Sequence, residues 1–258
     1  MKKYSCIFFF FSFFSFLQAQ NVSPIVLDKV NAREITVDLF GNIYLLQEAA
    51  LYKYSIAGEF LCSYSNFTLG SIRSVDVSNP MKIMLFYRDA GSIVFLNDQL
   101  SPIIETLDLY AKNLNTISLA TYSTTNNIIL FDHLNMDMIV LDFFLNEKSR
   151  VHFTFHDFDP IRMVEINEKQ LVMNNPATGF YFFDSFGTYE KTIGIKNIDF
   201  FQIINHAIYY LKEGGIYRYD YRKMEEKNIE IQQNNVKQVL VYRDKLILLK
   251  TNGNVLIY

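Results

Sequence analysis

Short apolar runs separated by polar turns recur along most of this chain, and the first set, between residues 35 and 54, shows the arrangement most clearly. Residues 43–46 form a continuous apolar run that is too short for a helix and is rich in strand-forming side chains. The Gly41-Asn42 pair forms a turn before it, and residues 51–54 form another strand after a second polar turn. Two strands joined by a short polar turn form a hairpin, so this stretch predicts consecutive antiparallel strands.

The same arrangement recurs five more times towards the C-terminus. The central strand of each copy has an apolar residue at an equivalent position, and neighbouring copies lie about forty residues apart, the length of one four-stranded propeller blade. These positions are Ile43, Ile83, Ile128, Leu171, Ile208 and Leu246. The spacing therefore predicts an all-β fold, a six-bladed β-propeller.

Both ends of the repeat region contribute to the expected ring. Residues 24–28 form a strand before the first copy, and the last copy stops after its third strand, at Tyr258. We therefore expect the N-terminal strand to close the last, sixth blade, which leaves no blade incomplete. Longer segments between copies predict outer strands at residues 103–107 and 150–155, and one helical turn at residues 110–115.

Residues 1–20 have the composition of a secretory signal peptide. Lys2 and Lys3 precede an apolar stretch at residues 7–17, and a small residue, Ala19, follows it. The apolar stretch is too short for a membrane span, and Cys6 lies before it, so Cys6 is not the lipidated cysteine of a lipoprotein signal. We therefore expect residues 21–258 to be a single exported propeller domain in the periplasm, with an extracellular location as the alternative.

The charge and the cysteine content of the chain reduce the range of possible functions. The chain has 24 basic and 27 acidic side chains, a net charge of −3, and no long basic run, so nucleic-acid binding is not expected. Cys62 is the only cysteine left once the leader is removed, which excludes an intramolecular disulfide. We expect Cys62 to be a small buried apolar side chain rather than a reactive thiol.

Two histidines alternate with phenylalanines in and just after the predicted outer strand at residues 150–155. His152 and His156, together with Asp157 and Asp159, could in principle hold zinc or copper. Metal ligands normally converge from several elements, however. The favoured interpretation is therefore an exposed strand with polar residues facing water.

Asp132, His133 and Asp137 lie in a turn between two strands of the third copy. A catalytic dyad would need a nucleophile and an orienting partner within reach, and the sequence has no Gly-x-Ser-x-Gly or His-Glu-x-x-His motif. A structural turn is therefore the favoured interpretation.

Acidic residues end the first strand of three copies, at Asp38, Asp76 and Glu165. Such side chains could converge near the central channel and bind calcium. Ala120 and Asn205 occupy the corresponding places in other copies, so we favour a structural role in which the carboxylates accept hydrogen bonds from turn amides.

Tyrosines are concentrated in the third strands of the copies. They can pack between blades or remain available for a partner surface, and we favour packing. The residues concerned are Tyr52, Tyr54, Tyr181, Tyr217, Tyr219 and Tyr221.

The first copy resembles the blade signature of NHL-type and TolB-like six-bladed propellers. Residues 38–44, Asp-Leu-Phe-Gly-Asn-Ile-Tyr, are followed by the strand at residues 51–54 and by Gly58, as in that signature. The later copies lose the Gly-Asn turn, and the chain has no Trp-Asp pair of the WD-repeat type. A looser resemblance, based on size, export and fold, is to accessory propellers of the bacterial envelope, such as the periplasmic plug of the type IX secretion translocon.

These observations favour a non-catalytic module for protein–protein interaction in the bacterial envelope. The resemblance implies an envelope protein as partner, such as an outer-membrane β-barrel complex in secretion or assembly, and we expect a monomer when the protein is free. No residue is selected as catalytic, cofactor-binding or metal-binding. The alternatives are a metal-dependent, lactonase-like propeller hydrolase and a sensor of a small ligand or peptidoglycan.

Overall fold

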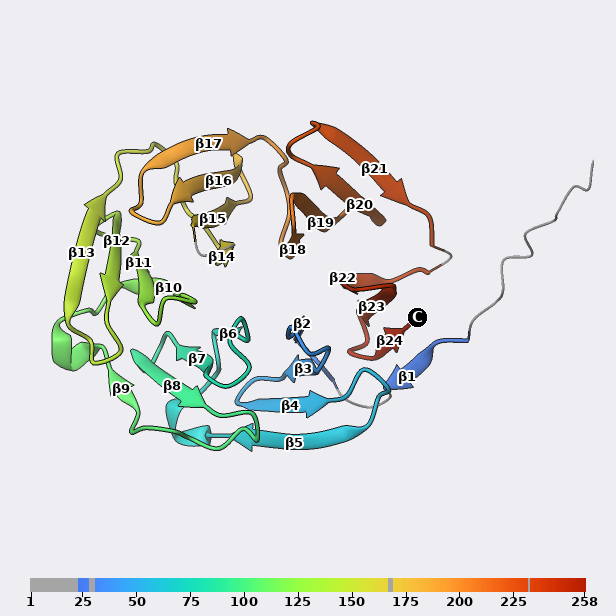
Figure 1. The fold of residues 1–258 in the computed structure, drawn as a ribbon, viewed down its shortest axis with the longest axis horizontal. Helices are drawn as coiled ribbons and strands as arrows, with labels where there is room; N and C mark the ends of the chain where they lie inside the picture. Colours follow the sequence, from blue (N-terminus) through green and yellow to red (C-terminus); the bar gives the residue numbers. More distant parts are fainter. Residues whose placement is uncertain (1–22, 28–30, 167–168, 232) are drawn as a thin grey trace, which may run out of the picture.

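The computed structural model describes residues 23–27, 31–166, 169–231 and 233–258. Within these residues, six four-stranded antiparallel sheets are arranged as blades around a centre (Figure 1). This arrangement confirms the six-bladed β-propeller that the forty-residue spacing predicts. The predicted signal peptide, residues 1–20, lies outside the described residues.

In each of the first five blades the chain runs from the innermost strand to the outermost. Blades 1 and 2 contain β2 (Glu34–Val37), β3 (Ile43–Leu46), β4 (Ala50–Tyr54), β5 (Phe60–Ser65), β6 (Ser74–Asp76), β7 (Ile83–Tyr87), β8 (Ser92–Leu96) and β9 (Leu107–Asp108). Blades 3 and 4 contain β10 (Ile117–Tyr122), β11 (Ile128–Asp132), β12 (Asp137–Leu141), β13 (Glu147–His152), β14 (Arg162–Ile166), β15 (Gln170–Asn175), β16 (Gly179–Asp184) and β17 (Tyr189–Ile193). Blade 5 contains β18 (Phe201–Ile204), β19 (Ala207–Lys212), β20 (Gly215–Asp220) and β21 (Glu225–Ile229).

Blade 6 is built from both ends of the chain. It contains β22 (Val236–Tyr242), β23 (Lys245–Lys250), β24 (Val255–Ile257) and, as its outermost strand, β1 (Ile25–Leu27). Strand β1 is antiparallel to β24, with Ile25 opposite Ile257 and Leu27 opposite Val255. The predicted closure of the ring by the N-terminal strand is therefore confirmed.

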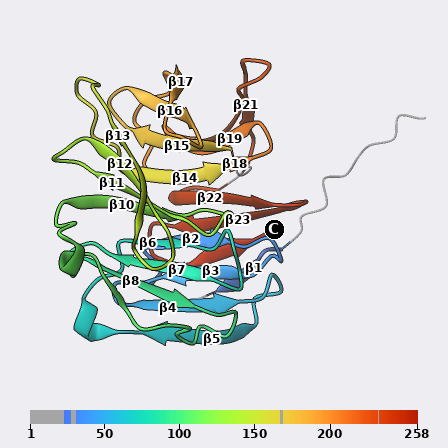
Figure 2. The ribbon, with the colours of Figure 1, turned by 60° about the vertical axis from the view of Figure 1, so that its left-hand side comes forward.

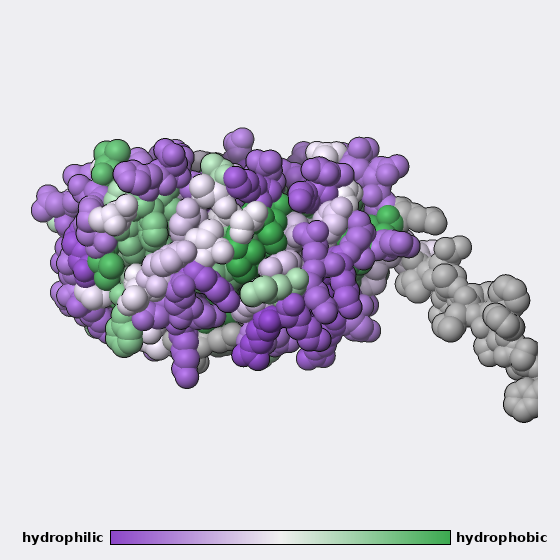
Figure 3. Space-filling model, turned by 90° about the horizontal axis from the view of Figure 1, so that it is seen from above, coloured by the Kyte–Doolittle hydropathy of each residue, from purple (hydrophilic) through white to green (hydrophobic). Residues whose placement is uncertain are grey.

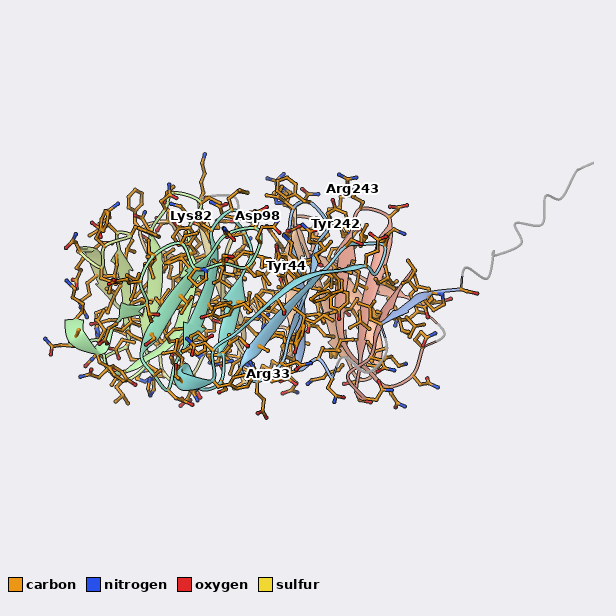
Figure 4. The ribbon with its side chains drawn as sticks, turned by 90° about the horizontal axis from the view of Figure 1, so that it is seen from below. Arg33, Tyr44, Lys82, Asp98, Tyr242 and Arg243 are labelled. Atoms are coloured by element: carbon orange, nitrogen blue, oxygen red, sulfur yellow. The ribbon has the colours of Figure 1, made fainter. Side chains whose placement is uncertain are left out.

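The six innermost strands, β2, β6, β10, β14, β18 and β22, surround the central channel (Figure 1; Figure 2). Because every blade repeats the same order of strands, these strands all begin on one side of the ring, here called the N-face, and end on the other, the C-face. Figure 4 shows Arg33, which precedes β2, on the opposite side of the ring from Tyr242 and Arg243, at the end of β22. The two faces therefore carry different side chains.

Apolar side chains fill the space between neighbouring blades. Leu46 and Leu51 of blade 1, for example, pack in one cluster with Leu85 and Val94 of blade 2. All six tyrosines that the sequence places in third strands are buried or half-buried, which confirms the packing role. Figure 3 shows one side of the rim, where apolar patches alternate with hydrophilic residues.

The outer strands differ from the predicted ones. The predicted strand at residues 103–107 is reduced to β9 and an isolated bridge between Leu96 and Pro102, so that prediction is wrong for most of its length. The predicted strand at residues 150–155 begins earlier, at Glu147, and ends at His152. The helical turn expected at residues 110–115 is present as a 3-10 turn, η2 (Tyr110–Lys112); a second, η1 (Phe67–Leu69), follows β5.

Candidate functional site: the central channel and the C-face

The central channel contains a cavity of about 290 Å³ that is lined by residues of all six inner strands. Each inner strand has one edge without a neighbouring strand, so its backbone groups on that edge need other hydrogen-bond partners. Side chains of adjacent blades supply many of these partners.

Two glutamines bond to inner-strand edges in the way a strand backbone would. Gln238 of β22 accepts a hydrogen bond from the Ile35 N–H at 2.9 Å and donates to the Ile35 carbonyl at 2.6 Å. Gln202 of β18 forms the same pair of bonds with Val241, at 2.7 and 3.1 Å. These contacts link blade 6 to blade 1 and blade 5 to blade 6.

Two of the predicted acidic residues also bond to a neighbouring blade. Asp76 of blade 2 accepts hydrogen bonds from the Thr121 hydroxyl at 2.6 Å and the Tyr122 N–H at 2.8 Å. Glu165 of blade 4 accepts hydrogen bonds from the Ser123 hydroxyl at 2.5 Å and the Thr124 N–H at 2.9 Å. Blade 3 is therefore held between carboxylates from both of its neighbours.

The third acidic residue, Asp38, organises the first turn of blade 1. Its carboxylate accepts hydrogen bonds from the Phe40 N–H, the Asn42 N–H and the Tyr44 hydroxyl, each at 2.9 Å. Gly41 in this turn has a φ of +90°, and a Cβ there would lie 2.6 Å from the Tyr242 ring. The expected role in bonding turn amides is therefore confirmed for Asp38.

The predicted equivalence of the three acidic residues is wrong. Glu165 pairs with Leu171, whereas Asp76 pairs with Met84, one residue beyond the repeat position, and Asp38 lies beyond the last pair of its strand. The carboxylates thus stand at different levels of the channel. Among the described residues there is also no group of three or more His, Cys, Asp or Glu side chains placed to hold a metal ion.

Arginines gather at the N-face opening of the channel, which we name the arginine mouth and define by Arg33, Arg73, Arg162 and Glu34. Arg162 of β14 forms an ion pair with Glu34 of β2 on the opposite side of the ring. Arg73, which precedes β6, donates a hydrogen bond to the Ile161 carbonyl at 2.9 Å. Arg33 donates to a backbone carbonyl of the next blade. The sequence pattern did not indicate these residues as a site, although arginine stands immediately before or at the start of the inner strand in three copies.

The arginine mouth carries more positive than negative charge. Burial lowers the pKa of Arg73, and the neighbouring positive charges of Arg88, Arg162 and Arg33 lower it further, while Glu34 opposes the effect. Because the only carboxylate among these neighbours is already paired with Arg162, the positive charge of Arg73 is poorly compensated.

The histidines and aspartates that were considered as metal ligands do not form one site among the described residues. His152 ends β13 and lies 3.0 Å from Asp137, which is also paired with Arg150 at 2.9 Å. His156 lies beyond the strand and is exposed, and the Asp157 carbonyl accepts a hydrogen bond from Asn175. The favoured interpretation of an exposed polar strand is confirmed for His152, whereas His156 lies in the loop that follows the strand.

Asp132 and His133 form a turn. The buried Asp132 carboxylate accepts hydrogen bonds from the Thr116 hydroxyl at 2.7 Å and the Asn135 amide at 2.8 Å. Burial raises the pKa of Asp132, but these hydrogen bonds outweigh burial and lower it overall. His133 Nδ1 lies 2.9 Å from the Thr116 carbonyl, so both side chains fix the chain direction at this turn.

Cys62 is a free, half-buried cysteine at the edge of the core between blades 1 and 2. Burial raises the pKa of its thiol, although the neighbouring Lys53 opposes this effect. A raised pKa lowers the thiolate fraction, as expected for a packing residue.

The C-face carries exposed apolar side chains on its turns. Leu39 and Phe40 are 59% and 64% exposed, beside Tyr242, whose hydroxyl contacts the Leu39 carbonyl. Met81 is exposed in the equivalent turn of blade 2, next to Lys82. In Figure 4, Lys82, Tyr242 and Arg243 lie along the same edge of the ring. We name Leu39, Phe40 and Met81 the C-face patch.

Comparisons with known proteins show the fold and no closer relationship. No protein-family model matches the chain, and no curated protein matches its sequence. The structure is similar to that of virginiamycin B lyase from Staphylococcus aureus, with a TM-score of 0.59, 10% identity and coverage of 86% of this chain and 78% of that chain. It is also similar to BBS1N in complex with ARL6DN (TM-score 0.56, 11% identity, 84% and 73% covered) and to the Neurospora crassa Pan2 WD40 domain (TM-score 0.54, 12% identity, 88% and 74% covered). One of these neighbours is an enzyme and another is a domain solved with a protein partner. The fold alone therefore does not distinguish a catalytic function from a binding function.

The described part of the chain has no helix with the length and hydropathy needed to cross a bilayer.

Proposed function

We propose that this protein is a non-catalytic interaction module that binds another protein through its C-face patch. The observation that carries the proposal is the exposure of Leu39 and Phe40 on a turn that Asp38 holds rigid. Exposure of apolar side chains of this size to water is unfavourable unless a partner covers them. Single exposed apolar residues are common on protein surfaces, so the evidence for a binding site is their grouping on one face.

Rigidity makes this turn suited to binding. Asp38 is 3% exposed, and its carboxylate accepts hydrogen bonds from two backbone N–H groups and from the side chains of Asn42 and Tyr44. The backbone that carries Leu39 and Phe40 is therefore already ordered before a partner arrives. A pre-ordered apolar anchor loses little conformational entropy on binding, which is the usual property of interface hot spots.

Positive charge accompanies the patch. Lys82 lies 4.7 Å from the ring centroid of Phe143, and the Arg243 guanidinium lies 5.2 Å from the ring of Tyr242. Cations beside an apolar centre favour a partner surface with an apolar core and an acidic rim.

The channel favours a binding role over a hydrolytic one. Asp76 and Glu165, the carboxylates that a channel metal or an acid–base reaction would use, accept hydrogen bonds from blade 3. Gln202 and Gln238 are likewise bonded to backbone. The polar groups of the channel thus support the ring.

The proposal places the partner in the bacterial envelope, in line with the leader expected at residues 1–20. An outer-membrane β-barrel complex for secretion or assembly, with this propeller as an accessory or plug subunit in the periplasm, is the specific form that we propose.

Affinity purification from crosslinked envelopes tests this proposal. The tagged wild type is compared with a Leu39→Asp/Phe40→Asp variant and with Phe67→Asp, a control on the N-face at a side chain that is 80% exposed. We expect one envelope protein to copurify in stoichiometric amount with the wild type and the control, and to be lost from the double variant. Recovery of free protein alone, or equal recovery with all three, would refute the proposal.

A further inference from the structure

The arginine mouth has an excess of positive charge in a protein whose overall net charge is −3. It contains three guanidinium groups and one carboxylate. Arg73 donates a hydrogen bond to the carbonyl of Ile161, the residue just before Arg162, and the charge of Arg162 is near enough to lower the pKa of Arg73. The single carboxylate, Glu34, is bonded to Arg162.

Arg73 and Arg162, the two arginines of the mouth that line the cavity, each have N–H donors beyond those in the hydrogen bonds described. A guanidinium carries five N–H donors. Among the described residues, hydrogen bonds engage Nη2 of Arg73 and Nη2 of Arg162. The Phe200 ring, whose centroid lies 5.1 Å from Arg162, helps to hold that side chain. Both side chains also line the cavity of the channel.

The lowered pKa of Arg73 agrees with this geometry, because burial and neighbouring arginines both disfavour its positive charge. A negative charge between Arg73 and Arg162 would relieve this repulsion. Guanidinium groups match the planar edge of a carboxylate or phosphate, with which they form paired hydrogen bonds.

We propose that the arginine mouth binds a small oxyanion, a phosphate or carboxylate group, between Arg73 and Arg162. The cavity of about 290 Å³ limits the ligand to a small molecule or to the end group of a larger one. The anion competes with Glu34 for Arg162. This binding site lies on the face opposite the C-face patch, and it does not depend on the proposed protein partner.

Calorimetric titration of the whole mature protein with inorganic phosphate and, separately, with succinate tests the proposal. The variants are R73Q and E34Q, with R243Q as a control that removes the same charge from the C-face. Circular dichroism and a thermal melt first establish that each variant is folded. We expect saturable binding of phosphate, succinate or both; the ligand that binds more tightly identifies the chemistry.

The variants should change affinity in opposite directions. R73Q should weaken binding by about tenfold or more, because it removes a charge-assisted contact. E34Q should strengthen binding, because it frees Arg162 from its competitor, whereas R243Q should leave the affinity unchanged. A purely structural role for these residues predicts no such strengthening.

Three results would overturn the proposal. The first is no saturable binding of either anion up to tens of millimolar. The second is equal weakening by R73Q and R243Q, which would indicate unspecific charge attraction. The third is weaker binding by folded E34Q.

Discussion

Arg162 of blade 4 and Glu34 of blade 1 form an ion pair across the diameter of the central channel. The two strands that carry them, β14 and β2, lie on opposite sides of the centre (Figure 1). The repeat positions of these two blades are Leu171 and Ile43, which pair with Glu165 and Val37 of the inner strands. Arg162 lies three residues before Glu165, and Glu34 lies three residues before Val37. Equivalent positions of opposite blades thus carry opposite charges, which join the two halves of the ring.

This ion pair should contribute to stability as a coupled unit. Glu34 is 8% exposed, so Arg162→Gln leaves a carboxylate with poor solvation and should cost about 2 kcal/mol of unfolding free energy. Glu34→Gln should cost less, because Arg162 is more accessible to water. Urea denaturation of both single variants and the double variant measures the coupling; the double variant should lose less than the sum of the two. Strict additivity would show that the pair contributes nothing specific.

The hydrogen bonds that Gln238 forms to blade 1 should contribute strongly to the free energy of unfolding. Gln238→Ala leaves the Ile35 N–H and carbonyl without their partner in a region where Gln238 itself is 2% exposed. We expect a loss of about 3 kcal/mol in urea denaturation, because two buried backbone groups become unsatisfied. Gln99→Ala, at an exposed turn, is the control and should be nearly neutral. Equal effects of both changes would contradict this role.

Ring closure should depend on β24. Deletion of residues 255–258 removes the strand that lies between β1 and β23, and we expect a large fall in melting temperature. A finer test is Ile257→Ala, which should cost about 3 kcal/mol because the side chain is buried, against little effect for the exposed Thr251→Ala. An unchanged thermal melt of the deletion variant would show that the ring does not need this strand.

Asp132 should make stability depend on pH. Hydrogen bonds in the folded state lower its pKa below the value of about 4 expected in the unfolded chain. The stabilisation is therefore fully present above the unfolded pKa and is lost as pH falls through the folded pKa. The difference in unfolding free energy between wild type and Asp132→Asn should be largest near neutral pH and should shrink at pH values of about 3 and below.

The repeat was predictable because each central strand is an apolar run whose place is fixed by burial on both faces, as at Ile43 and Ile83. Outer strands were placed less well, because β13 is almost entirely exposed and its residues have no apolar pattern. Phe153 misled the sequence interpretation, since it packs against Phe183 of the next blade after the strand has ended.

Cross-channel contacts were not predictable from the repeat. Arg73 bonds to Ile161 and Arg162 to Glu34 over separations of 88 and 128 residues, and no local pattern specifies such pairs. The sequence indicated the three acidic residues near the channel but not their levels in it. These levels depend on the pairing register of each inner strand, and a shift of one residue is not visible in the sequence pattern.

Binding of a partner to the C-face patch can be detected by site-specific photocrosslinking in living cells. A photoreactive phenylalanine analogue replaces Phe40 in one strain and Phe67, on the N-face, in another. We predict one adduct of defined mass at position 40 and none at position 67. Adducts of equal yield at both positions, or no adduct at position 40 in a protein that is folded and exported, would show that the C-face patch does not bind a partner.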